Sequence, residues 1–317
     1  MLECINMKTE YLKFILVAGL GWFLRMIIFF ILVVLAWGCT EEEIPENTND
    51  PDPFIEGSWV KYSPYKWTHD GHPYFGEYCT VFSDGCPQDM KEKASKLADT
   101  KFYEILELFD FTDHTDLRYP TERKTIDVYI NRNHPENMAA AYWGSIIITV
   151  RGSDINTTIY DYLFKHELTH VFEFLVEGTV NLAGEMWFTE GIAIVGGGGL
   201  NHIQTAEDLE LWISRNDTSP NKGNPITIKK WEDYPEGADK SGYYTIFEIV
   251  MDYLLDQEGA GRSLQDVLNL FYDLRNNMNF EESFERNFGI KLDVLEEEIF
   301  DRLIIYLNSN YQTVNIK

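Results

Sequence analysis

The clearest chemical signal in this sequence is the run His166, Glu167, Leu168, Thr169 and His170, which forms an HExxH pattern. On a helix, side chains four residues apart share a face, with β-carbons about 5–6 Å apart. Two imidazoles so placed can bind one zinc ion at about 2.1 Å each. Glu167 lies beside the first histidine and can reach a metal-bound water without being a ligand. The pattern therefore predicts a zinc site with Glu167 as its general base.

A third metal ligand is expected on a second helix. Glu190 lies twenty residues after His170, within the apolar run WFTEGIA at 187–193. A charged side chain rarely occupies such a run unless it is paired or binds a metal. Three protein ligands would leave one position of a tetrahedral zinc ion open, as in catalytic sites. Two alternatives stay open at this point: a pair of core histidines that bind no metal, and a Glu190 that faces solvent.

These two segments together resemble a known family. An HExxH pattern followed by W-F-x-E-G-x-A is similar to the gluzincin zinc peptidases, in particular to the peptidase MA-like group. The resemblance implies that His166, His170 and Glu190 hold one Zn²⁺ ion and that Glu167 is the catalytic base. It extends over most of 78–307, because the order of the surrounding elements is also similar.

The resemblance also implies an activity and a further catalytic residue. It implies a hydrolase that cleaves a peptide or protein substrate, which we place along the strand edge near 142–148. In related gluzincins a tyrosine donates a hydrogen bond to the oxyanion, and Tyr244, which opens YTIFEIVMDYLLDQEG, is the candidate. The adjacent Tyr243 is its rival, and an ordinary core tyrosine is the alternative. A different class of function also stays open, namely a surface lipoprotein that binds a partner and keeps a structural or vestigial zinc site.

Three other kinds of site share parts of these patterns, but the sequence does not match them. The metzincin pattern HExxHxxGxxH fails because Glu173 and Val176 occupy its glycine and third-histidine positions. A di-iron carboxylate site needs a second ExxH, and no other histidine has a glutamate three residues before it. The glycines at 196–199 follow a helical run and lack the lysine of a phosphate loop. We interpret them as a flexible exit from the helix that carries Glu190.

The first part of the folded chain is predicted to form a small sheet with one helix against it. Residues 78–82 alternate as a strand does, and 125–130 (TIDVYI) and 145–150 (SIIITV) are rich in β-branched residues. Between them, 88–109 repeats its apolar residues at helical spacing. These patterns predict a sheet lobe over 54–156.

The second part is predicted to be helical. Beyond residue 156 the apolar spacing indicates helices at 158–177, 186–195, 206–214, 243–257, 264–276, 280–288 and 292–307. We therefore expect an α+β fold, in which a small mixed sheet with a packed helix precedes a mainly helical lobe over 157–317. The resemblance implies a thermolysin-like core with the zinc site in the cleft between the two lobes.

The N-terminal residues predict export. Residues 11–37 are almost wholly apolar, and their uninterrupted part, 26–37, is too short to span a bilayer by itself. A small residue before Cys39 resembles a bacterial lipobox, which implies a lipoprotein signal peptide over 1–38 and a lipid on Cys39. An uncleaved anchor over 11–37 is the alternative.

The residues after this leader extend the same prediction. The stretch 39–53 is rich in acidic residues, asparagine and proline, the composition of a tether, so the folded domain is expected over 54–317. The acidic residues 41–43 resemble an export signal of Gram-negative surface lipoproteins. We expect an outer-membrane lipoprotein, held at the membrane by its lipid and exposed at the cell surface.

The net charge argues against one class of partner, and the cysteines leave two interpretations open. The 317 residues include 26 Lys and Arg against 52 Asp and Glu, a net charge of -26, which would repel nucleic acid. Within the expected folded domain, 54–317, the cysteines are Cys79 and Cys86, which we interpret either as a small disulfide loop or as free thiols. The oligomeric state has no signal in the sequence.

Overall fold

The computed structural model covers the whole chain and describes the residues 72–112, 114–120, 122, 124–133, 139–151, 154–179, 184–199, 203–216, 228 and 240–314. The chain divides into the units Met1–Pro53 and Phe54–Lys317, and all of these residues belong to the second. The predicted leader, the lipidation site Cys39 and the tether lie outside the described residues. Within the described ranges, no helix has the length and apolar character needed to cross a membrane.

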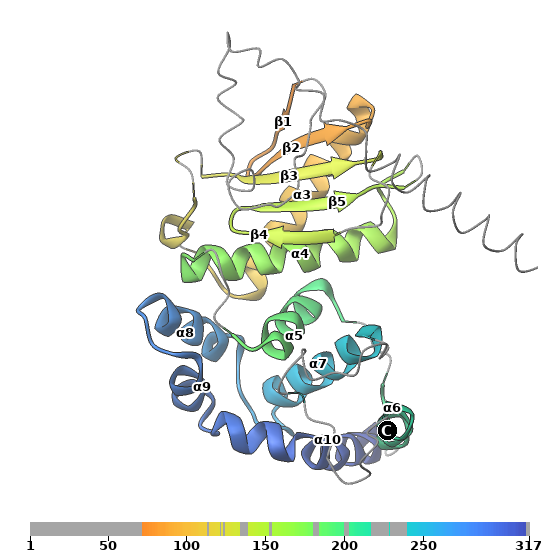
Figure 1. Cartoon of the computed structure of the whole chain (residues 1–317), viewed down its shortest axis with the longest axis vertical. Coiled ribbons are helices and arrows are strands. Elements are labelled where there is room, and N and C mark those ends of the chain that lie inside the picture. The colour runs from red at the N-terminus through yellow and green to blue at the C-terminus, as the bar shows by residue number, and fades with distance from the viewer. Residues whose placement is uncertain are drawn as a thin grey trace, which may run out of the picture. The chain divides into compact units, whose positions relative to one another are not determined.

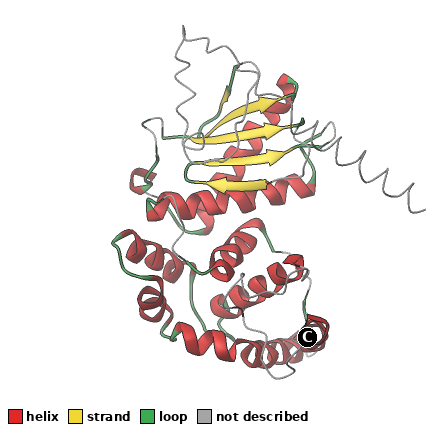
Figure 2. Ribbon diagram, in the orientation of Figure 1, coloured by secondary structure: helices red, strands yellow, loops and turns green. Residues whose placement is uncertain are grey.

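The described chain consists of one sheet followed by a group of helices (Figures 1 and 2). This arrangement confirms the predicted α+β class with a small mixed sheet and a helical part. The strands are β1 (Tyr74–Phe75), β2 (Cys79–Asp84), β3 (Ile126–Asn131), β4 (Ala139–Tyr142) and β5 (Ser145–Thr149). The helices are α3 (Gln88–Leu108), the 3₁₀ turn η1 (His114–Asp116), α4 (Thr158–Glu177), α5 (Met186–Gly197), α6 (Ala206–Asn216), α7 (Lys240–Leu255), α8 (Leu264–Arg275), α9 (Phe280–Phe288) and α10 (Leu292–Val314).

The sheet has the strand order β1-β2-β3-β5-β4. The three central strands β2, β3 and β5 run parallel, and β1 and β4 are antiparallel to their neighbours. Every residue of β3 and β5 is buried, as expected for parallel strands covered on both faces. A continuous cluster of buried apolar residues joins one face of the sheet to the helices, while Phe82, Tyr129 and Ile147 form a separate small cluster.

The structure changes the expected position of the sheet edge. The resemblance placed the substrate along a strand edge near 142–148, but β5 pairs with β3 on one side and with β4 on the other. The edge strand on this side of the sheet is β4, with the sequence AAAY. Alanine has little preference for strands, and β1 is only two residues long, so neither strand was predicted from the sequence.

Helix α3 packs against the sheet and also holds the turn before β2. Its side chains Ala94, Ala98, Phe102 and Ile105 recur at helical spacing and are 0 % exposed. On the same helix, the carboxylate of Asp99 accepts hydrogen bonds from the backbone N–H groups of residues 77, 78 and 79 at 2.8–2.9 Å. Charge-assisted bonds of this kind fix the start of β2 relative to α3.

Helix α4 is the central helix of the fold and lies between the sheet and the helical part (Figure 1). It contacts α3, β4 and β5 as well as α5 and α8. From His166 to Glu177 every residue is buried, because neighbours cover all sides of the helix. It ends at Gly178, which has a φ of 69°, a backbone conformation that favours glycine. A helix enclosed in this way holds its side chains in fixed positions.

Glycines allow α5 to approach its two neighbouring helices closely. A β-carbon on Gly196 would lie 2.2 Å from Oγ1 of Thr169 in α4, and one on Gly191 would lie 2.9 Å from the backbone oxygen of Phe247 in α7. The run 196–199 is therefore not simply a flexible exit from the helix. Its first two residues belong to α5, and Gly198 and Gly199 end it with positive φ.

Aromatic residues hold the other side of α5. Phe188 makes edge-to-face contacts with Phe271, Phe280, Phe284 and Phe288 of α8 and α9, at centroid distances of 5.3–6.4 Å. Such geometries are favourable for aromatic pairs. In addition, the indole Nε1 of the neighbouring Trp187 donates a hydrogen bond at 3.1 Å to the carboxylate of Glu296 in α10. These contacts fix the position of the helix that carries Glu190.

The two cysteines of the described chain are present as thiols. Cys79 and Cys86 are both buried and form no disulfide, which decides between the two interpretations of the sequence. Sγ of Cys86 donates to the backbone oxygen of Ile130 at 3.8 Å. Burial, with the nearby charge of Asp99, raises the pKa of Cys79 well above its ordinary value, so that this thiol is held in its unreactive protonated form.

Candidate metal centre

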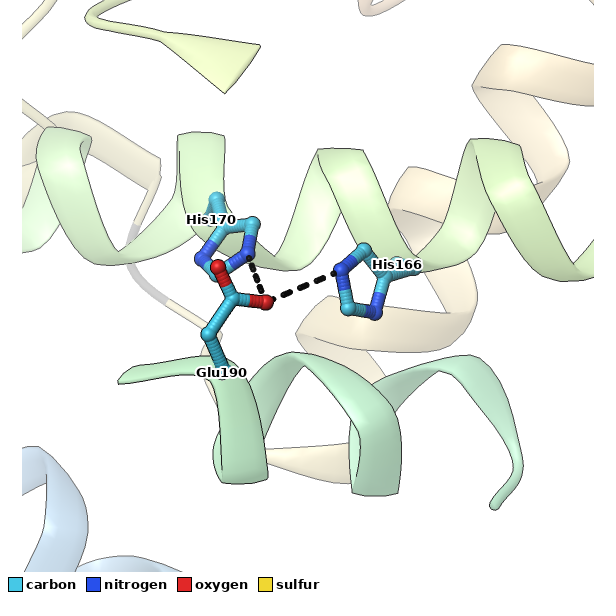
Figure 3. A group of neighbouring side chains, drawn as sticks. All are labelled: His166, His170 and Glu190. Carbon is cyan, nitrogen blue, oxygen red and sulfur yellow. Dashed lines mark ion pairs between the residues drawn. The ribbon is translucent and has the colours of Figure 1, made fainter. Parts of the chain in front are cut away.

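Helices α4 and α5 bring His166, His170 and Glu190 together (Figure 3). One ligand atom from each lies within 4.8 Å of the others. Oε2 of Glu190 is 3.4 Å from Nε2 of His166 and 3.4 Å from Nε2 of His170. The imidazole planes stand at 89° to each other with centroids 5.0 Å apart. Glu190 therefore points at the two rings and does not face solvent.

These separations fit a zinc ion. Ligand atoms placed tetrahedrally about 2.1 Å from zinc lie about 3.4 Å from one another, which is the separation between Glu190 and each imidazole. Two imidazole nitrogens and one carboxylate oxygen are also a donor set that zinc prefers. The arrangement can thus hold one ion through three side chains and leave a fourth position for water or substrate.

The electrostatic surroundings of Glu190 and His170 favour the charged form of each. Burial raises the pKa of Glu190, but the adjacent imidazoles outweigh this effect and lower its pKa to about 2. Burial lowers the pKa of His170, yet the carboxylates of Glu173 and Glu190 more than compensate and hold that pKa well above its ordinary value. A cation bound between these groups would take the place of the imidazole proton as the positive charge at the site.

Glu167 lies in the same cleft but outside the group of three. It is 6 % exposed, and burial, with the charge of Glu190, raises its pKa above the ordinary value, although the two imidazoles lower it in part. A raised pKa makes a carboxylate a stronger base, which suits a residue that must take up a proton during a reaction.

The cleft around these residues has a volume of about 310 Å³. Its lining includes Tyr244, which lies on α7. Burial, together with the charges of Glu190 and Glu167, raises the pKa of Tyr244, so the phenol keeps its proton and can donate a hydrogen bond. By contrast, Tyr243 is 2 % exposed and packs edge-to-face against Trp212, with centroids 5.1 Å apart. Of the two tyrosines, the structure places Tyr244 at the cleft.

Several residues of the site were not found from the sequence. The cleft is also lined by residues of β4, α4 and α5, namely Ala139, Ala140, Ala141, Phe174 and Thr189. Alanines, a phenylalanine and a threonine carry no chemical signal, so only the fold could place them here. Glu173 was considered in the sequence only as a departure from the metzincin pattern.

Each imidazole has a second polar neighbour on its Nδ1 side. The hydroxyl of Tyr162 lies 3.4 Å from Nδ1 of His166, and Oε2 of Glu173 lies 3.8 Å from Nδ1 of His170. Burial and the charges of Glu248 and Glu190 raise the pKa of Tyr162, which therefore stays neutral. Burial raises the pKa of Glu173 to about 7, even though His170 acts to lower it. Both Nε2 atoms are left directed toward Glu190.

Comparisons with known proteins found a distant similarity to solved structures. No protein-family model and no curated protein matches this sequence. Solved structures similar to it include an M1 zinc metallopeptidase from Deinococcus radiodurans, with 12% identity and a TM-score of 0.37. A mutant of that enzyme, alone and bound to a Tyr-Ser-Ala substrate, has 11% identity with TM-scores of 0.39 and 0.38.

In each of these comparisons the match covers 72% of this chain and 48% of the other. This chain thus spans about half the length of those structures.

Proposed function

We propose that this protein is a zinc-dependent peptidase, with His166, His170 and Glu190 as metal ligands and Glu167 as the general base. One observation carries the proposal. Oε2 of Glu190 lies 3.4 Å from the Nε2 atoms of both histidines, in a cleft whose lining also includes the buried carboxylate of Glu167. A purely structural zinc site would not need a base or an open position beside the ion.

The side chains have separate roles in this proposal. When bound by these three ligands, a zinc ion would supply an activated water and would polarise the scissile carbonyl of the substrate. Glu167 accepts the proton of that water and passes it to the nitrogen of the leaving amine. Tyr244, across the cleft on α7, donates a hydrogen bond to the oxyanion that develops on the carbonyl. The buried environment strengthens each of these interactions because little water competes for them.

We propose that a peptide substrate binds along β4. An extended peptide can add to an exposed strand edge through backbone hydrogen bonds. Of the four residues of Ala139–Tyr142, the first three are alanines and line the cleft together with Glu167, so their small side chains leave room for a substrate backbone. This placement moves the substrate from the predicted segment 142–148 to the strand that forms the sheet edge.

Replacing Tyr244 by phenylalanine is expected to lower kcat by about 10²–10³-fold, the usual effect of losing one oxyanion donor, while zinc content stays unchanged. The matched control is Tyr243→Phe, which removes a hydroxyl from the adjacent residue, outside the cleft lining. Steady-state kinetics of both variants on one peptide substrate make the comparison. Equal kcat values for Tyr244→Phe and the parent enzyme would show that another group stabilises the oxyanion.

Removal of the metal tests the proposed function directly. The purified protein is expected to contain one zinc ion per chain by elemental analysis and to cleave members of a peptide library. A chelator should abolish cleavage, and added Zn²⁺ should restore it. A protein that binds zinc but cleaves nothing before or after reconstitution would instead support a binding module with a structural zinc site.

We also propose that the protein acts at the cell envelope, as an outer-membrane lipoprotein exposed at the surface. The support is the sequence alone: an apolar leader over 1–38, Cys39 after it and an acidic tether over 39–53. Incorporation of labelled palmitate is expected in the parent protein and absent in Cys39→Ala. Labelling that persists in Cys39→Ala would exclude this lipidation site.

A further inference from the structure

Glu173 lies on α4, three residues after His170. It faces Nδ1 of the His170 ring, whereas Glu190 faces Nε2. Its Oε2 is 3.8 Å from Nδ1 of His170, and its side chain is 0% exposed. Neither this Nδ1 nor either carboxylate oxygen of Glu173 has a hydrogen-bond partner in the described part of the chain. We infer that Glu173 is a positioning residue for the metal ligand His170, an inference that rests on the proposed zinc function.

The chemistry of imidazole explains why such a residue is needed. A neutral imidazole that binds a metal through Nε2 must carry its proton on Nδ1. Nε2 of His170 faces Glu190 at 3.4 Å, so Nδ1 is the atom that carries the proton. A carboxylate behind the ring accepts that proton in a hydrogen bond, fixes the tautomer and makes Nε2 a stronger ligand. Glu173 is the group that can do this for His170.

Packing does not account for a glutamate at this position. The neighbouring core residues of α4, Val171, Phe172 and Leu175, are apolar and 0 % exposed. An apolar side chain of similar volume would fill the same space without placing a carboxylate away from water. The glutamate is therefore explained by the polar atom that it faces, which is Nδ1 of His170.

The two histidines differ in the group that faces their Nδ1 atom. His166 has a neutral phenol on its Nδ1 side, with the Tyr162 hydroxyl at 3.4 Å, whereas His170 has a carboxylate. A hydrogen bond to an ionised acceptor is stronger than one to a neutral group. Loss of Glu173 should therefore leave all three proposed ligands in place but make His170 a weaker ligand, so that zinc binds less tightly.

The test compares zinc affinity and fold stability in variants of the full-length chain. Affinity is measured by competition with a chromophoric chelator, and stability by thermal unfolding of the metal-free protein. Glu173→Leu is expected to weaken zinc binding by about 10–100-fold, as removal of such an outer partner does elsewhere. Its unfolding temperature should stay close to that of the parent, because leucine fills the space of the glutamate while His170 keeps Glu190 as a charged partner.

Glu173→Gln provides a second variant in case the leucine variant does not fold. Its amide oxygen can still accept a hydrogen bond from Nδ1 but carries no charge, so its zinc affinity should fall between those of the parent and Glu173→Leu. The matched controls are Glu177→Leu and Glu177→Gln, because Glu177 is also a buried glutamate of α4, 3 % exposed, and lies one turn further along. These controls should change zinc affinity by less than about twofold.

The outcomes separate this inference from the proposed function. If the parent protein holds no zinc, the proposed function itself fails. If the parent holds zinc and both Glu173 variants bind it as tightly, the positioning role is wrong while the zinc site stands. Equal weakening in the Glu177 variants would also overturn the inference, since the effect would then come from any change in this part of α4.

Discussion

Glu167→Gln is expected to lower kcat on a peptide substrate by about 10²–10⁴-fold, the range of general acid–base catalysis. Glutamine has nearly the same shape as glutamate, but its amide cannot take up the proton of the attacking water. Glu167 is outside the group of three proposed metal ligands, so the variant should still contain one zinc ion per chain. Rates from steady-state kinetics and zinc from elemental analysis, on the same preparation, measure the two effects together.

The control for this substitution is Glu177→Gln. Glu177 is a buried carboxylate on the same helix, and it does not line the cleft. Its replacement should leave kcat close to that of the parent enzyme, although it makes the same chemical change in α4. A Glu167→Gln enzyme as fast as the parent would mean that the base has been assigned wrongly, even if the zinc site is correct.

His170→Ala is expected to remove the metal and, with it, all measurable cleavage. The substitution removes one of the three proposed ligands and leaves Glu190 with a single imidazole partner. Zinc affinity should therefore fall by more than the roughly 10–100-fold that loss of an outer partner costs. Zinc content after dialysis, followed by a cleavage assay with added Zn²⁺, measures the effect.

The control for His170→Ala is the same substitution at a surface histidine, His72. His72 is exposed and lies before β1, away from the three ligands in the sequence. His72→Ala should retain one zinc ion and full activity, whereas Glu190→Gln should lose zinc as His170→Ala does. Full zinc occupancy in both His170→Ala and Glu190→Gln would require a metal site elsewhere, and the proposed function would lose its basis.

Much of the fold could be predicted from local patterns. The spacing of apolar residues predicted helices at 158–177 and 280–288, and the structure has helices over these same residues. Helical periodicity depends on residues three and four apart, so it is visible in a short window of sequence. The strand β4 could not be found in this way, because its AAAY sequence has no pattern of its own and its extended form depends on pairing with β5.

The choice between the two adjacent tyrosines shows the same limit. Tyr243 and Tyr244 are neighbours on α7, and their side chains point in directions about 100° apart around the helix. Either could have been the one in the cleft, and the sequence favoured Tyr244 only through resemblance to a family. The packing of Tyr243 on Trp212, which lies on α6, leaves Tyr244 to line the cleft.

By itself, the sequence determined the residue types of the site and the helix that places two of them together, because an HExxH spacing puts both imidazoles on one face of any helix. Only the tertiary structure decided that Glu190 meets both rings at 3.4 Å, that Glu173 stands behind His170 and that β4 forms the edge of the sheet. The physical reason is distance along the chain. Contacts within one helix follow from its repeat, whereas contacts between elements depend on how several separate surfaces pack, including glycines such as Gly191 and Gly196 that allow close approach.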